Sequence, residues 1–192
     1  SLCMDYLIIS ETNHFPLVKN PGNQVNNYHQ GATQENNFTA ANPNFLAMYG
    51  MEWGVISGGG HVVVYGDGMD DLWGWETGSG VWGATNNYDT YVPKNVYTSG
   101  TGLFKTVNDN LGKNTFATLA HPNLGDFNNI ANIPYDAVAD NAIVGAAVES
   151  GHAFSTNTTY SNPGSSLRYL YYYKLMLAKG YHLGHTISHE TH

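Results

Sequence analysis

The last twelve residues, 181–192, contain four histidines and one glutamate, which are side chain types that bind catalytic divalent metal ions. An alternating run typical of a short strand leads into them. A strand that ends in Glu190-x-His192 would deliver two ligands to one place. Because catalytic metal sites need ligands that converge from several elements, partners are expected earlier in the chain.

Three earlier segments have the same form, an apolar run and then a ligand-type residue. One ends near His14, one runs from Glu52 to His61, and one ends at His121. In parallel α/β folds, functional groups gather at the carboxyl ends of the strands, because the loops there open on one shared face. The pattern therefore predicts a metal-dependent hydrolase whose site lies at the carboxyl ends of several strands.

The elements that would position these residues alternate between strand and helix patterns. Helical spacing and end signals predict helices and one helical turn, whereas the Asn, Gln, Gly and Pro of residues 19–31 are typical of a loop. A glycine turn at 58–60 predicts that the strands on either side are a hairpin or neighbours. The order predicts a parallel α/β sheet or barrel. The expected strands are 4–10 (buried on both faces), 45–57, 61–66, 116–120, 142–148 and the final run, and the expected helices are 32–41, 102–111, 135–140 (one turn) and 165–179.

Composition limits the class of protein. A chain of 192 residues is most simply one domain, and its single cysteine excludes an internal disulfide. The net charge of −8, without a basic run, argues against a nucleic-acid partner. It does not argue against a phosphorylated small molecule, because bound cations would dominate the local potential. No run is long and apolar enough to predict a membrane span, and charged residues are only 11% of the chain, which is common in exported proteins.

Several short motifs together resemble one family. Gly50-Met51-Glu52, Gly60-His61-Val62, Leu119-Ala120-His121-Pro122 and the closing Glu190-Thr191-His192 follow one another in the order of the motifs of the PHP family, the polymerase-and-histidinol-phosphatase metallohydrolases. The likeness covers nearly the whole chain and is closest to the secreted or periplasmic bacterial members. Ser10-Glu11-Thr12-Asn13-His14 is similar to that family's Thr-Asp-His-Asn segment.

The resemblance implies a distorted (β/α)₇ barrel with two or three Zn, Mn or Fe ions at its carboxyl-end face. Glu52 matches the bridging carboxylate, and His61 and His121 match single histidine ligands. Glu190 and His192 match a closing Asp-x-His pair. Such enzymes hydrolyse phosphoesters with a metal-bound hydroxide, because the ions lower the pKa of bound water and stabilise the developing charge.

The chain departs from the family pattern at three places. The family's opening His-x-His has no counterpart. Because residue 1 is already close to an apolar strand and the last residue is itself a candidate ligand, both ends are expected to be cut and the chain to be part of a longer domain. Thr12 stands where the family has a histidine, which leaves His14, two residues on, as the candidate ligand. Glu190 replaces a shorter aspartate. These departures raise the alternative of a barrel without activity.

Other residues are expected around the ligands. Trp53 and two tryptophans of the Trp-, Gly- and Asn-rich insertion at 67–97 are predicted to line a substrate cleft, because aromatic faces suit sugars and flat organic groups; covering the barrel rim is an equal alternative. Three further residues are expected to support the ligands or the fold rather than to bind metal. The two tryptophans are Trp73 and Trp75, and the three supporting residues are Glu11, Glu149 and His189.

Three functions follow from these patterns. The first is a PHP-type phosphoesterase that acts on a phosphorylated small molecule, with Glu52 and His121 at its catalytic centre. The second is an inactive PHP-like barrel that serves as an extracellular structural or binding module. The third is a carbohydrate-binding protein that uses the tryptophan-rich segment.

Overall fold

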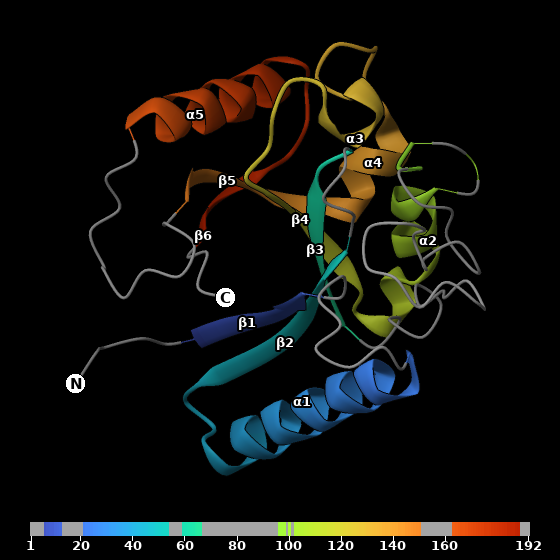
Figure 1. Ribbon diagram of the computed structural model, residues 1–192, viewed down its shortest axis with the longest axis vertical. Coiled ribbons are helices and arrows are strands. Elements are labelled where there is room, and N and C mark those ends of the chain that lie inside the picture. The colour runs from blue at the N-terminus through green and yellow to red at the C-terminus, as the bar shows by residue number, and fades with distance from the viewer. Residues whose placement is uncertain are drawn as a thin grey trace.

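The computed structural model describes residues 6–12, 21–53, 59–66, 96–98, 100, 102–150 and 163–188. In this part of the chain, one six-stranded sheet curls into a half-barrel, and its strands follow the order of the sequence (Figure 1). Its strands are β1 (Tyr6–Thr12), β2 (Leu46–Trp53), β3 (His61–Tyr65), β4 (Phe116–Ala120), β5 (Ile143–Ser150) and β6 (Gly184–Ser188). The helical segments are α1 (Pro21–Ala41), α2 (Leu103–Asp109), η2 (Leu111–Lys113), α3 (Asp126–Asn129), α4 (Ala137–Ala142) and α5 (Pro163–Ala178).

All strands except β3 run in the same direction. β1 is parallel to β2, and β4, β5 and β6 are parallel to one another, whereas β3 is antiparallel to both of its neighbours. The prediction that the strands on either side of the glycine turn are a hairpin or neighbours is therefore confirmed. The predicted parallel sheet is wrong at β3, because a strand that follows its neighbour through a tight turn must run in the opposite direction. The carboxyl ends of five strands and the amino end of β3 consequently lie along one rim of the sheet.

The two faces of the sheet have different surroundings. On one face, Met51, Val62 and Leu119 join the main core, together with Leu103 and Phe104 of α2. Helices α1, α2, α4 and α5 pack against the sheet around this side (Figure 1). The opposite face carries a smaller cluster of buried residues, Val63, Tyr65 and Ala120.

Most of the expected elements are present, with small shifts at their ends, but residues 21–31 of the loop predicted at 19–31 are helical. Helix α1 begins at Pro21 and continues through Gly31. Proline is well tolerated at the first position of a helix. A Cβ on Gly31 would lie 2.3 Å from the Tyr49 ring, so this glycine lets the helix approach β2 closely. Gly31, which is typical of a loop, here serves a contact between helix and sheet.

The expectation that the first strand is buried on both faces is also wrong. Ile8 and Ile9 are 39% and 52% exposed. The physical reason is the position of β1, which pairs only with β2 and forms one edge of the described sheet. An apolar run alone does not distinguish a central strand from an edge strand.

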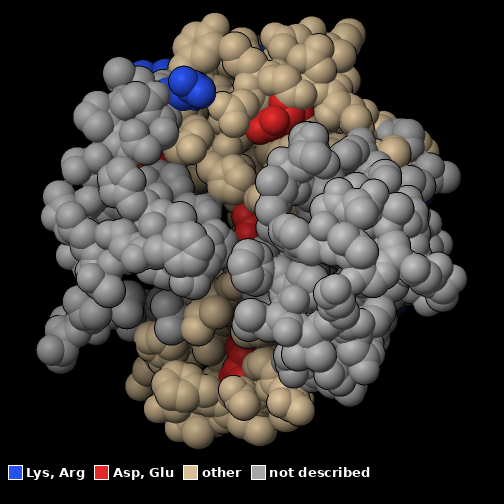
Figure 2. Space-filling model, viewed as in Figure 1, with Lys and Arg blue, Asp and Glu red and all other residues tan. Residues whose placement is uncertain are grey.

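Among the described residues, charged side chains are sparse on the face shown in Figure 2. Acidic side chains are visible at separate points between uncharged ones, and the basic side chains lie over α5.

None of the helices in the described ranges has both the length and the hydropathy that crossing a membrane would require.

Candidate metal centre

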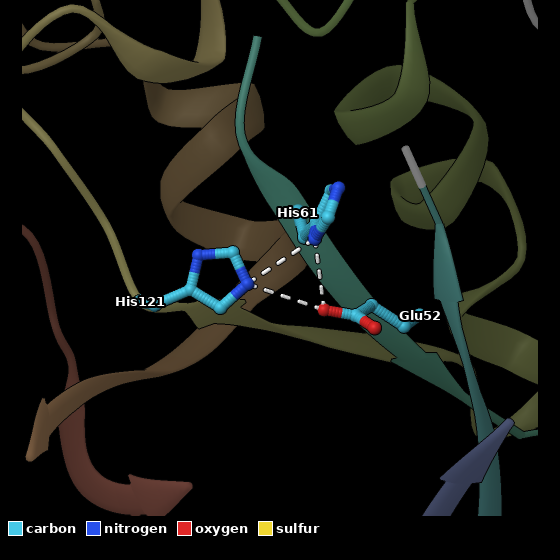
Figure 3. A group of neighbouring side chains, drawn as sticks. All are labelled: Glu52, His61 and His121. Carbon is cyan, nitrogen blue, oxygen red and sulfur yellow. Dashed lines mark hydrogen bonds and ion pairs between the residues drawn. The ribbon is translucent and has the colours of Figure 1, made fainter. Parts of the chain in front are cut away.

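Three of the predicted ligands meet at the rim of the sheet. Glu52 is the penultimate residue of β2, His61 is the first residue of β3, and His121 directly follows β4 (Figure 3). The pairing of the strands brings them together, because Glu52 is opposite Val63 on β3, and His61 is opposite Ala120 on β4. Residues up to 69 positions apart in the sequence thus converge through three adjacent strands.

The three side chains point at one another and form a small triangle of potential ligand atoms. His61 Nδ1 lies 3.0 Å from Glu52 Oε1 and 3.2 Å from His121 Nε2. His121 Nε2 lies 3.3 Å from the same Glu52 oxygen. Figure 3 shows the two imidazole rings and the carboxylate facing a common point. Within the described residues, this is the group that could hold a metal ion.

The triangle has the size that a metal site requires. Atoms that bind one ion at about 2.0–2.2 Å are separated by about 2.8–3.6 Å, depending on whether the angles are octahedral or tetrahedral. The observed separations of 3.0, 3.2 and 3.3 Å fall within that range. Two histidines and one glutamate are also a known ligand set of catalytic zinc sites, which keep a further position open. The residues present therefore fit a divalent cation.

The carboxylate of Glu52 is buried but ionised. Its side chain is 8% exposed, while those of His61 and His121 are 14% and 26% exposed. Burial raises the pKa of Glu52, but the hydrogen bonds from His121 and His61 outweigh this effect and hold the pKa well below its usual range. At neutral pH the site therefore offers a negative charge to a cation, with two imidazole nitrogens beside it.

The backbone at His121 adopts an uncommon conformation. Its φ of 27° lies on the left-handed side, where residues other than glycine are rare. Such conformations cost on the order of 1–3 kcal/mol and persist only where the surrounding structure enforces them. The residue that follows is Pro122, which is buried. The turn directs the imidazole of His121 back toward Glu52 at the end of β4.

Two other predicted site residues lie in the described part of the chain, outside the group of three. Trp53 is 1% exposed, and its ring packs edge to face against Tyr97 in the core, with 5.5 Å between ring centroids. Glu149 lies near the carboxyl end of β5, on the same rim as Glu52, but is not part of the metal-binding group among the described residues. The others lie outside the described residues: His14, Trp73, Trp75, His189, Glu190, His192 and the side chain of Glu11.

A second polar cluster, which the sequence did not predict, lies at the opposite rim. Asp140 accepts hydrogen bonds from the backbone N–H of His182 at 2.7 Å, from Nδ1 of the same histidine at 2.8 Å and from the Tyr135 hydroxyl at 2.7 Å. These bonds fasten α4 to the segment that leads into β6. The side chain of His182 is 86% exposed.

Tyr97 and the turn at Phe127 contact residues that adjoin two of the three candidate ligands, and these contacts were not expected from the sequence. Tyr97 comes at the end of a segment without helix or strand periodicity, and Phe127 lies in a turn of Asn and Gly residues. The available signal was an aromatic residue isolated among polar ones, which is too common to be informative.

Comparison of the chain with protein-family models, with curated proteins and with solved structures gave no match. Its function must therefore be argued from the geometry of its own residues.

Proposed function

We propose that this protein binds a divalent metal ion through Glu52, His61 and His121 and hydrolyses a phosphoester. The observation that supports this proposal best is the triangle of one carboxylate oxygen and two imidazole nitrogens, with edges of 3.0–3.3 Å. Nitrogen and oxygen ligands of this kind suit Zn, Mn or Fe.

Each side chain has a definable role in this proposal. Glu52 contributes the negative charge, and its buried position keeps the charge aimed at the other two residues. His61 would bind through Nδ1 and His121 through Nε2, so both nitrogens must be unprotonated when the cation is present. A bound cation supplies Lewis acidity, which activates water and stabilises the charge that develops on a phosphoryl group.

The strand directions support a larger site of the PHP type. His14 follows β1 in the sequence, and Glu190 and His192 follow β6, and both strands end at the rim that carries Glu52. We propose that these residues provide further ligands and that the half-barrel belongs to a distorted (β/α)₇ barrel. Strands that follow one another in sequential order are what a barrel requires, whereas doubly wound sheets reverse their order.

A second candidate function is a binding or structural module without catalysis. It is favoured by the hydrogen bonds within the cluster, because both histidines already contact the Glu52 carboxylate. A buried carboxylate with such partners is stable without a cation. The cluster would then serve only to join three strands.

Metal dependence of turnover separates these candidates. The protein is first treated with EDTA, and Zn²⁺, Mn²⁺ or Fe²⁺ is then added back with p-nitrophenyl phosphate or bis(p-nitrophenyl) phosphate as substrate. We expect hydrolysis that requires one of the metals and falls by at least about 100-fold in His121→Ala.

An exposed carboxylate remote from the cluster provides the control. Asp109 is 54% exposed and paired with Lys105, so Asp109→Asn should keep the wild-type rate. Stoichiometric metal binding without any turnover would favour the module, and absence of metal binding would contradict the proposed metal centre itself.

A further inference from the structure

Tyr97 connects the segments that carry the three candidate ligands. It is fully buried in the core, just before α2. Its ring packs edge to face against Trp53, the neighbour of Glu52, with centroids 5.5 Å apart. Its hydroxyl donates a hydrogen bond of 2.5 Å to the carbonyl of Gly60, the neighbour of His61. One side chain thus touches residues adjacent to two of the ligands.

Two glycines directly before His61 are packed closely against their neighbours. Gly59 and Gly60 have φ values of 104° and 87°, a region that residues other than glycine rarely adopt. A Cβ on Gly60 would lie 2.6 Å from the Phe127 ring, so the glycine backbone is packed directly against that side chain. The backbone N–H of Phe127 also donates to the Gly59 carbonyl at 2.6 Å. The direction in which β3 starts, and with it the position of His61, is therefore set by Tyr97 and Phe127.

The third connection runs to the loop that begins at His121. Although labelled α3 in Figure 1, this part of the loop is a left-handed turn, because Phe127, Asn128 and Asn129 have φ values of 56°, 55° and 63°. The Asn128 side-chain oxygen accepts a hydrogen bond of 2.6 Å from the backbone N–H of Tyr97. The rings of Tyr97 and Phe127 pack edge to face at 5.5 Å. The turn and Tyr97 thus hold each other in place.

We propose that Tyr97 is the positioning residue of the metal centre, because it fixes the segments next to Glu52 and His61 and the loop that follows His121 relative to one another. This inference rests on the proposed metal-binding function and extends it to a residue that would touch neither metal nor substrate. The Tyr97 hydroxyl is the critical group, because it donates the hydrogen bond to the Gly60 carbonyl. Burial raises the pKa of the Tyr97 phenol, and the charge of Asp126 raises it further, so the hydroxyl keeps its proton and remains a donor.

The variant Tyr97→Phe tests this role, because it removes the hydroxyl and keeps the packed ring. Tyr173→Phe is the matched control, since the Tyr173 hydroxyl also donates to a backbone carbonyl, that of Leu183, at 3.0 Å and away from the cluster. The probe is Zn²⁺ alone, titrated calorimetrically into each protein. We expect Tyr97→Phe to bind Zn²⁺ about 10-fold more weakly than the wild type, as is common when a group that orients metal ligands is lost. Tyr173→Phe should bind with unchanged affinity, although both variants lose one hydrogen bond.

A second readout without metal keeps this inference separate from the proposed function. Imidazole ¹⁵N spectra of the EDTA-treated proteins report the environment of His61 and His121. In Tyr97→Phe the signals of His61 should shift, whereas in Tyr173→Phe they should match the wild type. If the wild type binds no Zn²⁺ but the His61 signals shift in this way, the proposed function fails and the positioning role stands. If the imidazole signals and the Zn²⁺ affinity of Tyr97→Phe both equal those of the wild type, the positioning role is refuted.

Discussion

Replacement of Glu52 by glutamine tests how much of the metal site depends on the buried carboxylate. The substitution keeps the size of the side chain and removes the charge that His61 and His121 contact at 3.0 and 3.3 Å. Hydrogen bonds to a charged group are worth about 1.5–3 kcal/mol, roughly twice as much as neutral ones. Because the side chain is only 8% exposed, solvent screens this loss weakly. The metal-free variant should therefore be less stable than the metal-free wild type by about 1–3 kcal/mol.

The effect of zinc on stability should also differ between the two proteins. A ligand present at one hundred times its dissociation constant adds about 2.7 kcal/mol of stability. For a domain of this size, each kcal/mol raises Tm by about 2–4 °C, so zinc should raise the Tm of the wild type by about 5–10 °C. Glu52→Gln lacks the anionic ligand and should show a shift of less than about 2 °C at the same zinc concentration.

Differential scanning calorimetry with EDTA and with Zn²⁺ measures both quantities. Asp109→Asn is the control, because it removes a carboxylate at an exposed ion pair and should keep the full zinc shift. An equal zinc shift in wild type and Glu52→Gln would refute the assignment of Glu52 as a ligand, whatever the stability of the variant.

Two further predictions concern stability. Asp140→Asn should destabilise the protein at pH 7, and the difference in stability should disappear as pH falls. Partial burial raises the pKa of Asp140, but hydrogen bonds from His182 and Tyr135 outweigh this effect and lower the pKa. The stabilisation is therefore present above the unfolded pKa of about 3.9 and is lost as pH falls through the folded value. Urea unfolding at pH 7 and pH 3 measures this, and a difference that grows toward acid would contradict it. Gly60→Ala should lower the free energy of unfolding by about 1–3 kcal/mol, because φ is 87° and the new methyl group would lie 2.6 Å from the Phe127 ring. An unfolding midpoint equal to that of the wild type would contradict this account of the turn.

The candidate ligands could be predicted because they follow a local rule. His121 follows an apolar run, Glu52 lies within the expected strand 45–57, and strands with a common direction end on one side of a sheet. The resemblance of the short motifs to those of a metallohydrolase family also indicated both residues. His61 could be added because glycines predicted a tight turn and therefore adjacent strands. The sequence thus contained the order of the strands at this rim, and the pairing that brings the three side chains together follows from it.

The features that could not be predicted depend on contacts between distant residues. Gly31 resembles a loop residue until the ring of Tyr49 is seen against it. Ile8 and Ile9 resemble a central strand until the strand order places them at an edge. Tyr97 has no local pattern, and its role depends on Gly60, 37 positions earlier, and on Asn128, 31 positions later. Long-range contacts of this kind leave no periodic signal in a single sequence.

The most direct test of the metal centre is an X-ray diffraction measurement on crystals grown with Zn²⁺, with anomalous data collected at the zinc edge. The anomalous peak should lie about 2.0–2.2 Å from a Glu52 carboxylate oxygen, from His61 Nδ1 and from His121 Nε2. A zinc peak beside other residues, or no peak beside Glu52, His61 and His121 in crystals with zinc in excess, would contradict the proposed metal centre.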